Sequence, residues 1–265
     1  MKQSRKEIAA QLGISESTMG LWLSLKDYAK PVALPKVLSI DEFKGDTEYG
    51  KFQCILTSPV EKRILDILPT RYISQIYEYL HDFSNRRQVQ CAIMNMNKEY
   101  LHIAKQLLPQ ATVVIDRFHI VRYCTWALEN VRKGIQKALP KDERIYFKHS
   151  RKFLLTHMSR LPDESKAALE RMLLVSRDLR EVYLLKEVFY KFMESRNSLQ
   201  AKERLREFRL HAHVADIPEF EACLTMLQNW EKYILNAFDC PYSNGFTEGV
   251  NNTIKVIKRI GYGYR

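Results

Sequence analysis

The sequence predicts an α+β protein in which a mixed β-sheet with flanking helices is joined to a long helical segment. Short β-prone runs alternate with helical patterns between residues 37 and 116. From about residue 120 to residue 237, apolar residues recur at helical spacing and no run is typical of a strand. The first 30 residues have the pattern of two short helices separated by a glycine. These three observations define the expected domain organisation.

Residues 1–30 carry a helix-turn-helix pattern. Apolar residues on one face predict a helix over Arg5–Leu12, which Gly13 ends. Ser15 is suited to cap a second helix because its hydroxyl can accept from backbone N–H groups of the first turn. The inward-facing residues of that second helix would be Met19, Trp22 and Leu23. In this motif the second helix enters the major groove of DNA, so we expect Glu16, Ser17 and Thr18 near bases or phosphates.

Composition favours DNA binding over a helical hairpin that binds nothing. The chain has 42 Lys and Arg against 31 Asp and Glu, a formal net charge of +11, which suits a polyanionic partner. Its five cysteines include no C-x-x-C pair, so neither a zinc module nor a disulfide framework is indicated, and a reducing cytoplasm is expected. There is no apolar run of about 18 residues that would span a membrane.

Residues 31–36 are predicted to be a linker because two prolines disfavour helix there. Three β-prone runs follow at short intervals, which predicts an antiparallel meander with a turn at Gly45 and Asp46. The expected strands are Val37–Phe43, Phe52–Thr57 and Arg63–Leu68.

The next four elements alternate between helix and strand. We expect helices over Ile73–Phe83 and Lys98–Leu108, and strands over Val89–Asn95 and Thr112–Asp116. Strands connected through helices pair in parallel, so the complete sheet should be mixed.

Residues 121–238 are predicted to be all-helical. Apolar positions such as Leu169, Met172 and Phe192 fit the inward face of packed helices. Trp126 and Trp230 are expected to be buried core aromatics, and the alternative is that they stack on splayed bases.

The last helix contains Glu248, the only carboxylate after Asp239. At about 100° per residue, one face of this helix groups Glu248 with an amide and cations, and the opposite face carries an apolar stripe that we expect to be buried. The polar face contains Asn252, Lys255 and Arg259, and the apolar stripe contains Val250, Ile254 and Ile257. We expect Asn252, Lys255, Lys258 and Arg259 to contact DNA phosphates. The alternative is an ordinary amphipathic helix with a solvated basic face.

Three acids are placed where they can converge. Asp41 and Asp116 end predicted strands, and Glu248 lies on the last helix. Carboxylates from adjacent strand ends and a packed helix can hold two divalent cations that clamp the oxygens of a phosphodiester. Oxygen-only ligands favour Mg²⁺ or Mn²⁺, so we expect a two-metal site that contains Asp41, Asp116 and Glu248.

Three motifs carry a resemblance to a known family. They are Ile40–Phe43, Val114–His119 and, most specifically, Ser243–Lys255. With these motifs the chain resembles the ISL-three family of bacterial DDE transposases over nearly its whole length. The resemblance implies an RNase H-like catalytic domain over residues 31–265, with residues 121–238 as a helical insertion and residues 1–30 as an upstream helix-turn-helix.

The resemblance assigns the first and last acids but leaves the middle one open. Asp41 resembles the first and Glu248 the last. The middle acid of an RNase H-like sheet follows the first helix, a position that Asn95 occupies here, whereas Asp116 belongs to the more conspicuous motif. If Asn95 holds the middle position, a neutral amide replaces a carboxylate, which should weaken metal binding and impair catalysis. His119 is expected to support Asp116 and not to transfer protons.

The family resemblance also implies a function. It predicts metal-dependent cleavage and strand transfer of double-stranded DNA at terminal inverted repeats, by a homo-oligomer assembled on the element ends and target DNA. The alternative is an impaired relic that only binds DNA. Family members typically begin earlier, with a Cys/His-rich segment, and continue past residue 265, so the sequence resembles a shortened or degenerate copy.

Overall fold

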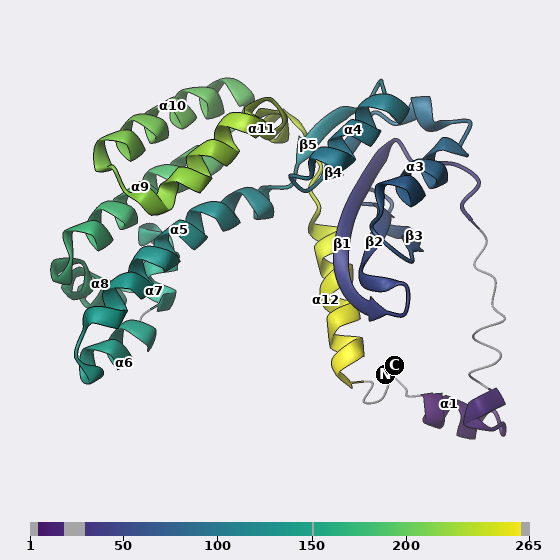
Figure 1. The fold of residues 1–265 in the computed structure, drawn as a ribbon, viewed down its shortest axis with the longest axis horizontal. Coiled ribbons are helices and arrows are strands. Elements are labelled where there is room, and N and C mark those ends of the chain that lie inside the picture. The colour runs from purple at the N-terminus through teal and green to yellow at the C-terminus, as the bar shows by residue number, and fades with distance from the viewer. Residues whose placement is uncertain (1–4, 19–29, 150, 261–265) are drawn as a thin grey trace.

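A computed structural model describes residues 5–18, 30–149 and 151–260 of the chain (Figure 1). Among these residues, five strands form a mixed sheet in the order β3-β2-β1-β4-β5. β1 is antiparallel to β2, which is antiparallel to β3, whereas β4 and β5 are added in parallel beside β1. The strands are β1 (Val37–Thr47), β2 (Gly50–Ser58), β3 (Arg63–Leu68), β4 (Cys91–Met94) and β5 (Thr112–Ile115). The predicted α+β class and the mixed sheet are confirmed.

The predicted turn at Gly45 and Asp46 is wrong. β1 continues through both residues to Thr47, and the reversal is made by the next two residues before Gly50. The pairing register shifts between Lys44 and Thr47, and Asp46 has a φ of 51°. Gly45 and Asp46 therefore mark a β-bulge and not the hairpin turn. The prediction failed because bulges and turns both favour residues that tolerate positive φ.

The two faces of the sheet pack against different helices. Alternate residues of a strand point to opposite faces, and Leu38 and Ile40 belong to the main core together with Ile76 of α3 (Ile73–His81) and Ile103 of α4 (Lys98–Leu107). On the other face, Val37 packs with Ala237 from α11 (Glu221–Asp239). That face also receives α12 (Gly245–Ile260), which runs beside β1 in Figure 1.

Between β5 and α12 the described residues form helices joined by short loops, with no strand, as predicted. The segment starts at Arg117, four residues before the predicted boundary, because α5 follows β5 directly. Its α-helices are α5 (Arg117–Ala138), α6 (Lys141–His149), α7 (Arg151–Leu155), α8 (Asp163–Val175), α9 (Arg177–Met193), α10 (Ser198–Ala215) and α11, and short 3₁₀ turns lie at Met158–Arg160 and Pro218–Phe220. A third 3₁₀ turn, Arg86–Gln88, precedes β4.

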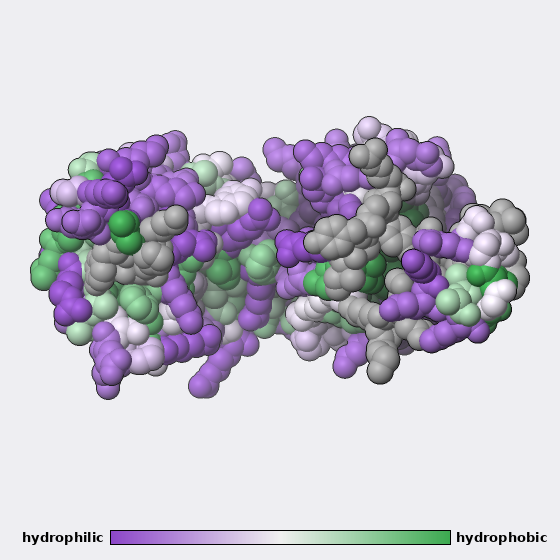
Figure 2. Space-filling view, turned by 90° about the horizontal axis from the view of Figure 1, so that it is seen from below, coloured by the Kyte–Doolittle hydropathy of each residue, from purple (hydrophilic) through white to green (hydrophobic). Residues whose placement is uncertain are grey.

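The helical segment lies to one side of the sheet and is joined to it where β5 enters α5 and α11 returns toward α12 (Figure 1). Two side-chain hydrogen bonds fix this junction. Arg117 donates to the carbonyl of Ala237 at 2.8 Å, and Asn236 donates to the carbonyl of Val113 at 2.8 Å. Seen from below in Figure 2, both parts carry hydrophilic side chains over much of their surface. No helix among the described residues is long and apolar enough to cross a membrane.

The described part of the N-terminal unit agrees with the first half of the predicted motif. α1 spans Arg5–Gln11, Gly13 has a φ of 67°, and the hydroxyl of Ser15 accepts from the backbone N–H of Thr18 at 3.0 Å. Helical residues begin again at Glu16. The predicted inward residues Met19, Trp22 and Leu23 lie outside the described residues, so the helix-turn-helix stays a prediction.

Candidate active site

The strand register places three polar residues in one row. Ile40 of β1 pairs with Met94 of β4, and Met94 pairs with Ile115 of β5. The next residues along the chain are Asp41, Asn95 and Asp116 respectively. Asn95 and Asp116 directly follow β4 and β5, but β1 continues to Thr47, so the expectation that Asp41 ends its strand is wrong. Ile40, Met94 and Ile115 all belong to the main core. Because successive residues of a strand point to opposite faces, the residues that follow them face the other side of the sheet, where α12 lies.

Asp41 is held by two hydrogen bonds. Its Oδ1 accepts from the backbone N–H of Glu42 at 2.8 Å, and its Oδ2 accepts from the side-chain amide of Asn251 on α12 at 2.9 Å. Only 6% of Asp41 is exposed. Burial raises the pKa of Asp41 above its ordinary value, and the negative charge of Asp116 acts in the same direction. A buried carboxylate beside another one is suited to hold a cation.

Asp116 lies at the start of α5 and is turned away from the usual capping role. It is the N-cap residue, yet its side chain accepts no hydrogen bond from the helix backbone. Instead its Oδ2 lies 3.1 Å from Nδ1 of His119, one turn along the helix. Burial alone would lower the pKa of His119, but the bond to Asp116 and the charge of Asp41 raise it above its ordinary value. The structure therefore pairs His119 with Asp116, as predicted.

Glu248 on α12 lies near the row formed by Asp41, Asn95 and Asp116. Burial, the adjacent carboxylate of Asp116 and the charge of Asp41 together raise the pKa of Glu248 to about 7, with burial the largest cause. Its Oε1 is buried and has no hydrogen-bond donor in the described structure. Three acids from three distant parts of the sequence thus influence one another electrostatically, which the predicted convergence requires.

Asn95 occupies the centre of the row. Its Oδ1 is buried and lacks a hydrogen-bond donor among the described residues, although buried amide oxygens are usually satisfied. Asn97, two residues later, caps α4: its side-chain oxygen accepts a hydrogen bond from the backbone N–H of Glu99 at 2.8 Å. The strand therefore ends at Met94, Asn95 turns into the site, and Asn97 starts the helix.

α12 contacts the sheet through a polar face, so the expectation of a buried apolar stripe is wrong. Asn244, Thr247 and Asn251 are the buried residues of this segment, and they recur at helical spacing. Thr247 and Thr57 share a 2.7 Å hydrogen bond between hydroxyl groups. Ser39 hydrogen-bonds to both Asn244 and Thr247. Hydrogen bonds to the inward polar residues of β1 and β2 fix the helix, whereas the predicted apolar stripe is only partly buried and Ile257 is 49% exposed.

Most of the residues predicted to contact DNA are exposed. Asn252, Lys255 and Arg259 lie on the exposed side of α12. Lys258 is also exposed, but its ammonium group donates to the carbonyls of Lys44 and Gly45 at the β1 bulge. Glu16 and Ser17 are exposed and Thr18 is half-buried at the start of the second helical stretch.

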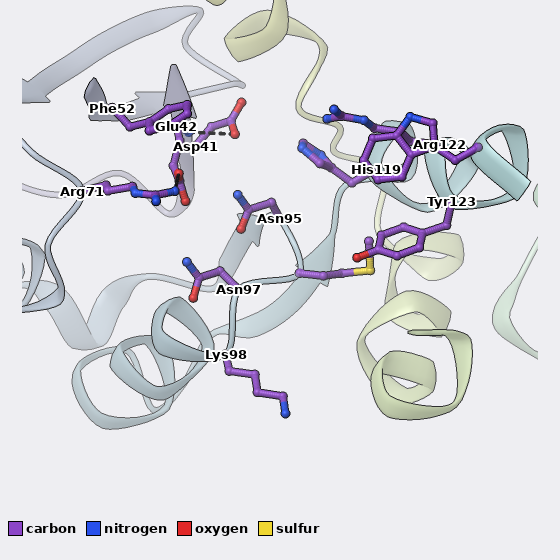
Figure 3. Close-up of a pocket in the computed structure, with 12 residues that line it drawn as sticks. Asp41, Glu42, Phe52, Arg71, Asn95, Asn97, Lys98, His119, Arg122 and Tyr123 are labelled. Atoms are coloured by element: carbon purple, nitrogen blue, oxygen red, sulfur yellow. Dashed lines mark hydrogen bonds and ion pairs between the residues drawn. The ribbon is translucent and has the colours of Figure 1, made fainter. Parts of the chain in front are cut away.

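A cleft of about 530 Å³ opens beside the row. Asp41 and Asn95 lie on one side, and His119, Arg122 and Tyr123 from α5 lie on the other (Figure 3). Its remaining lining residues are Glu42, Phe52, Arg71, Met96, Asn97, Lys98 and Trp126. Sequence reasoning missed Arg71, Lys98, Arg122 and Tyr123, although the spacing of Arg122 and Tyr123 from His119 places them on one face of a helix.

The donor atoms of the site suit a hard divalent cation. Asp41, Asp116 and Glu248 offer carboxylates, and two buried oxygens without donors, Asn95 Oδ1 and Glu248 Oε1, remain available. Within the described ranges, no three His, Cys, Asp or Glu side chains are close enough to form a ready metal cluster. The residue types are those that magnesium or manganese prefers, although the arrangement of the described residues is not that of a complete metal site.

Comparison with known proteins yields one family and one curated relative. A family model with the description Transposase, for DDE transposases of the ISL-three type, matches residues 38–265. The transposase for insertion sequence element IS1001 of Bordetella parapertussis is 26% identical over 234 residues, which cover 86% of this chain and 57% of the relative. The chain thus spans a little more than half the length of that relative. No solved structure matches the chain.

Proposed function

Since the chain belongs to the ISL-three family of DDE transposases, we propose that it is an insertion-sequence transposase that binds terminal inverted repeats and catalyses DNA strand cleavage and transfer. Residues 31–265 would form an RNase H-like catalytic domain with residues 121–238 as its helical insertion, and residues 1–30 would be a helix-turn-helix that reads the repeats. The strand order β3-β2-β1-β4-β5 is consistent with an RNase H-like sheet.

One observation carries the proposal: the strand register that aligns Asp41, Asn95 and Asp116 on the face covered by α12, which brings Glu248. Oxygen ligands from one face of a sheet, completed by an acid from a packed helix, form the oxygen-rich site that phosphodiester cleavage uses. Asp41 and Glu248 would hold the two Mg²⁺ or Mn²⁺ ions, together with whichever of Asn95 and Asp116 serves as the middle ligand. When bound, the ions would activate the attacking oxygen and stabilise the leaving one.

The register favours Asn95 as the middle position. It lies on β4, the direct neighbour of β1, and its unsatisfied Oδ1 is available as a ligand. Asp116 lies one strand farther from Asp41 and is bonded to His119. In this assignment Asp116 and His119 support the site, and the neutral amide of Asn95 weakens metal binding because one negative charge is absent.

The protein's own residues would bind and position DNA around this centre. Lys255 and Arg259 point to solvent on the helix that carries Glu248, so they would contact backbone phosphates, and DNA affinity should fall steeply with salt. Lys258 would mainly hold α12 to the β1 bulge. Family membership implies both element ends and target DNA as substrates, and we propose that the active form is a homo-oligomer assembled on those ends.

The decisive experiment measures Mn²⁺-dependent nicking of a duplex that carries the terminal repeats of the element encoding this chain. The proteins compared are the natural chain, Asn95→Asp, and Asn95→Asp combined with Glu248→Gln. We expect Asn95→Asp to nick more strongly than the natural chain, and Glu248→Gln to abolish the gain. Equal nicking with and without Glu248→Gln would refute the catalytic assignment.

The same experiment separates the second candidate, a relic that binds DNA without cutting it, which the amide at Asn95 motivates. Specific binding to the repeats by the natural chain, with metal-dependent nicking only in Asn95→Asp, would establish the relic. Nicking by the natural chain at a rate similar to that of Asn95→Asp would exclude it and assign the middle role to Asp116.

A further inference from the structure

One face of α5 presents an aromatic and cationic stripe to the cleft. His119, Arg122, Tyr123 and Trp126 are spaced i, i+3, i+4 and i+7, so they lie on one side of the helix, and all four line the cleft. The opposite side of the same turns is apolar and buried, with Cys124, Ala127 and Leu128 in the main core. Within the stripe, Tyr123 also packs against the main core, whereas Arg122 and Trp126 remain exposed.

Trp126 stands out because a large aromatic residue is left open to solvent. It is 47% exposed, whereas Trp230, the other tryptophan that the structure describes, is 7% exposed within the helical core. The expectation that both would be buried is thus correct for Trp230 and wrong for Trp126. The ring of Trp126 lies 5.8 Å from that of Tyr123, and the guanidinium of Arg122 lies 4.2 Å from the Trp126 centroid.

Trp126 lines the same cleft as His119, Asp41 and Asn95. Trp126 lies seven residues after His119, which corresponds to roughly 10 Å along a helix. That distance is on the scale of one or two nucleotides. The cleft that both residues line, about 530 Å³ in volume, is large enough to admit a base with its sugar and phosphate.

On this basis, and resting on the transposase function proposed above, we propose that Trp126 and Tyr123 form a platform on which a DNA base unstacked beside the cleaved phosphate is held. Aromatic faces accept any base, and cations placed among them attract the backbone. Arg122 would contact the phosphate of that nucleotide. These are positioning residues, since none of them belongs to the metal-binding row.

The charges around the platform favour a nucleic acid over an apolar protein surface. Arg122 and Lys98 line the cleft and form no ion pair with any side chain in the described part of the chain, so their charge is available to an anion. Arg71 also lines it but is paired with Glu42 at 2.7 Å. An apolar protein partner would have to desolvate these cations without compensating them, whereas phosphate groups compensate them directly.

The test compares two fluorescently labelled single-stranded oligothymidines of about eight nucleotides, one intact and one with an abasic site at its centre. Both carry the same phosphates, so only base stacking distinguishes them. Affinities are measured by anisotropy at fixed salt, without divalent ions, for the natural chain, Trp126→Ala and Trp126→Phe. Tyr77→Ala serves as a matched control, because Tyr77 is 39% exposed, stacks on a neighbouring ring and does not line the cleft.

We expect the natural chain to prefer the intact oligonucleotide. Trp126→Ala should lower its affinity for that oligonucleotide by roughly 10-fold, within the range of about 5- to 150-fold that stacking contributions imply, and should leave the abasic affinity unchanged. Trp126→Phe should restore most of the preference, because a phenyl ring still stacks. Tyr77→Ala should behave like the natural chain.

Other outcomes would overturn the platform in distinguishable ways. Equal affinity of the natural chain for both oligonucleotides, or an equal loss for both in Trp126→Ala, would mean that Trp126 does not read a base, and the transposase function would still stand. If Trp126→Ala dissociated a multimer in sedimentation experiments without changing DNA affinity, the stripe would be a protein interface. Absence of binding to oligonucleotides and to repeat duplex alike would reject the proposed function itself.

Discussion

The side-chain amide of Asn251 donates a 2.9 Å hydrogen bond to Oδ2 of Asp41, across 210 residues of sequence. This bond joins the last helix to the first strand inside a buried polar layer. It also fixes which oxygen of Asp41 faces α12 and which accepts from the backbone of Glu42. Asn251 thus serves both the stability of α12 and the orientation of the first acid.

Asn251→Ala should therefore destabilise the protein. The substitution leaves a buried carboxylate oxygen without its donor, which costs about 1–3 kcal/mol of unfolding free energy. Asn252→Ala is the matched control, since its side chain is exposed on the same helix and its loss should change stability by less than about 0.5 kcal/mol. Urea denaturation of the three proteins checks this, and equal midpoints would mean that the bond contributes nothing.

Without divalent ions, the protein should lose stability as the pH rises toward neutrality. Burial, and then the adjacent carboxylate of Asp116, raise the pKa of Glu248 from 4.5 to about 7. Between those values the folded state binds more protons than the unfolded state, so the unfolding free energy falls with increasing pH. Glu248→Gln removes this contribution. Denaturation in EDTA should show that the unfolding free energy falls more between pH 5 and pH 7.5 for the natural chain than for Glu248→Gln. An equal fall in both proteins would contradict the raised pKa.

Manganese should stabilise Asn95→Asp far more than the natural chain. A ligand bound only by the folded state stabilises it by about 2.7 kcal/mol at 100 times its dissociation constant. Thermal unfolding with Mn²⁺ and after EDTA measures the difference. Asn97→Asp adds the same charge to the same cleft but at the cap of α4, so it should gain little. If Mn²⁺ instead raised the melting temperature of the natural chain strongly, and Asp116→Asn removed that increase, Asp116 would be the middle ligand.

A buried ion cluster in the helical segment should make that segment sensitive to acid. Glu129 accepts from Arg132 at 2.9 Å and from Arg151 at 2.7 Å. Burial alone would raise the pKa of Glu129, but these two partners outweigh it and lower the pKa below its ordinary value. The cluster therefore stabilises the fold above the ordinary pKa of a glutamate, and the contribution is lost as the pH falls through the lowered value.

Removing the Glu129 side chain leaves Arg132 buried without its partner, so Glu129→Ala should cost about 3–5 kcal/mol at neutral pH. The exposed Glu143 on α6 provides the control Glu143→Ala, which should change stability by less than about 0.5 kcal/mol. The measurement is urea unfolding at pH 7 and pH 4. The stability difference between the natural chain and Glu129→Ala should shrink at the lower pH, and a constant difference would exclude an ionic origin.

The fold was predictable from local patterns because the strands are short, apolar and bounded by turn residues. The β3 boundaries Arg63–Leu68 match exactly those expected, and the parallel addition of β4 and β5 follows from their helical connections. The bulge at Asp46 could not be distinguished from a turn, since both favour residues that accept positive φ. The distinction depends on the pairing partner, which local sequence does not encode.

The site was predictable only in part. Strand ends indicated Asp41 and Asp116, and their alignment with Asn95 depends on a register that only the assembled sheet provides. The helical pattern of α12 was correct but its buried face was not, because the sheet presents Ser39, Asp41 and Thr57 to it and selects polar partners. The same tertiary context left Trp126 exposed, which periodicity alone could not indicate.

The order of the elements along the chain has a consequence for biosynthesis. The first strand is made early, and the helix that completes the site is made only after the whole helical segment. At about 5–20 residues per second, the 210 residues between Asp41 and Asn251 take roughly 10–40 s to translate. A nascent chain therefore carries Asp41, Asn95 and Asp116 without Glu248 while the whole helical segment is being made. The catalytic centre proposed for this protein would therefore be completed only after α12 has been made and has packed onto β1.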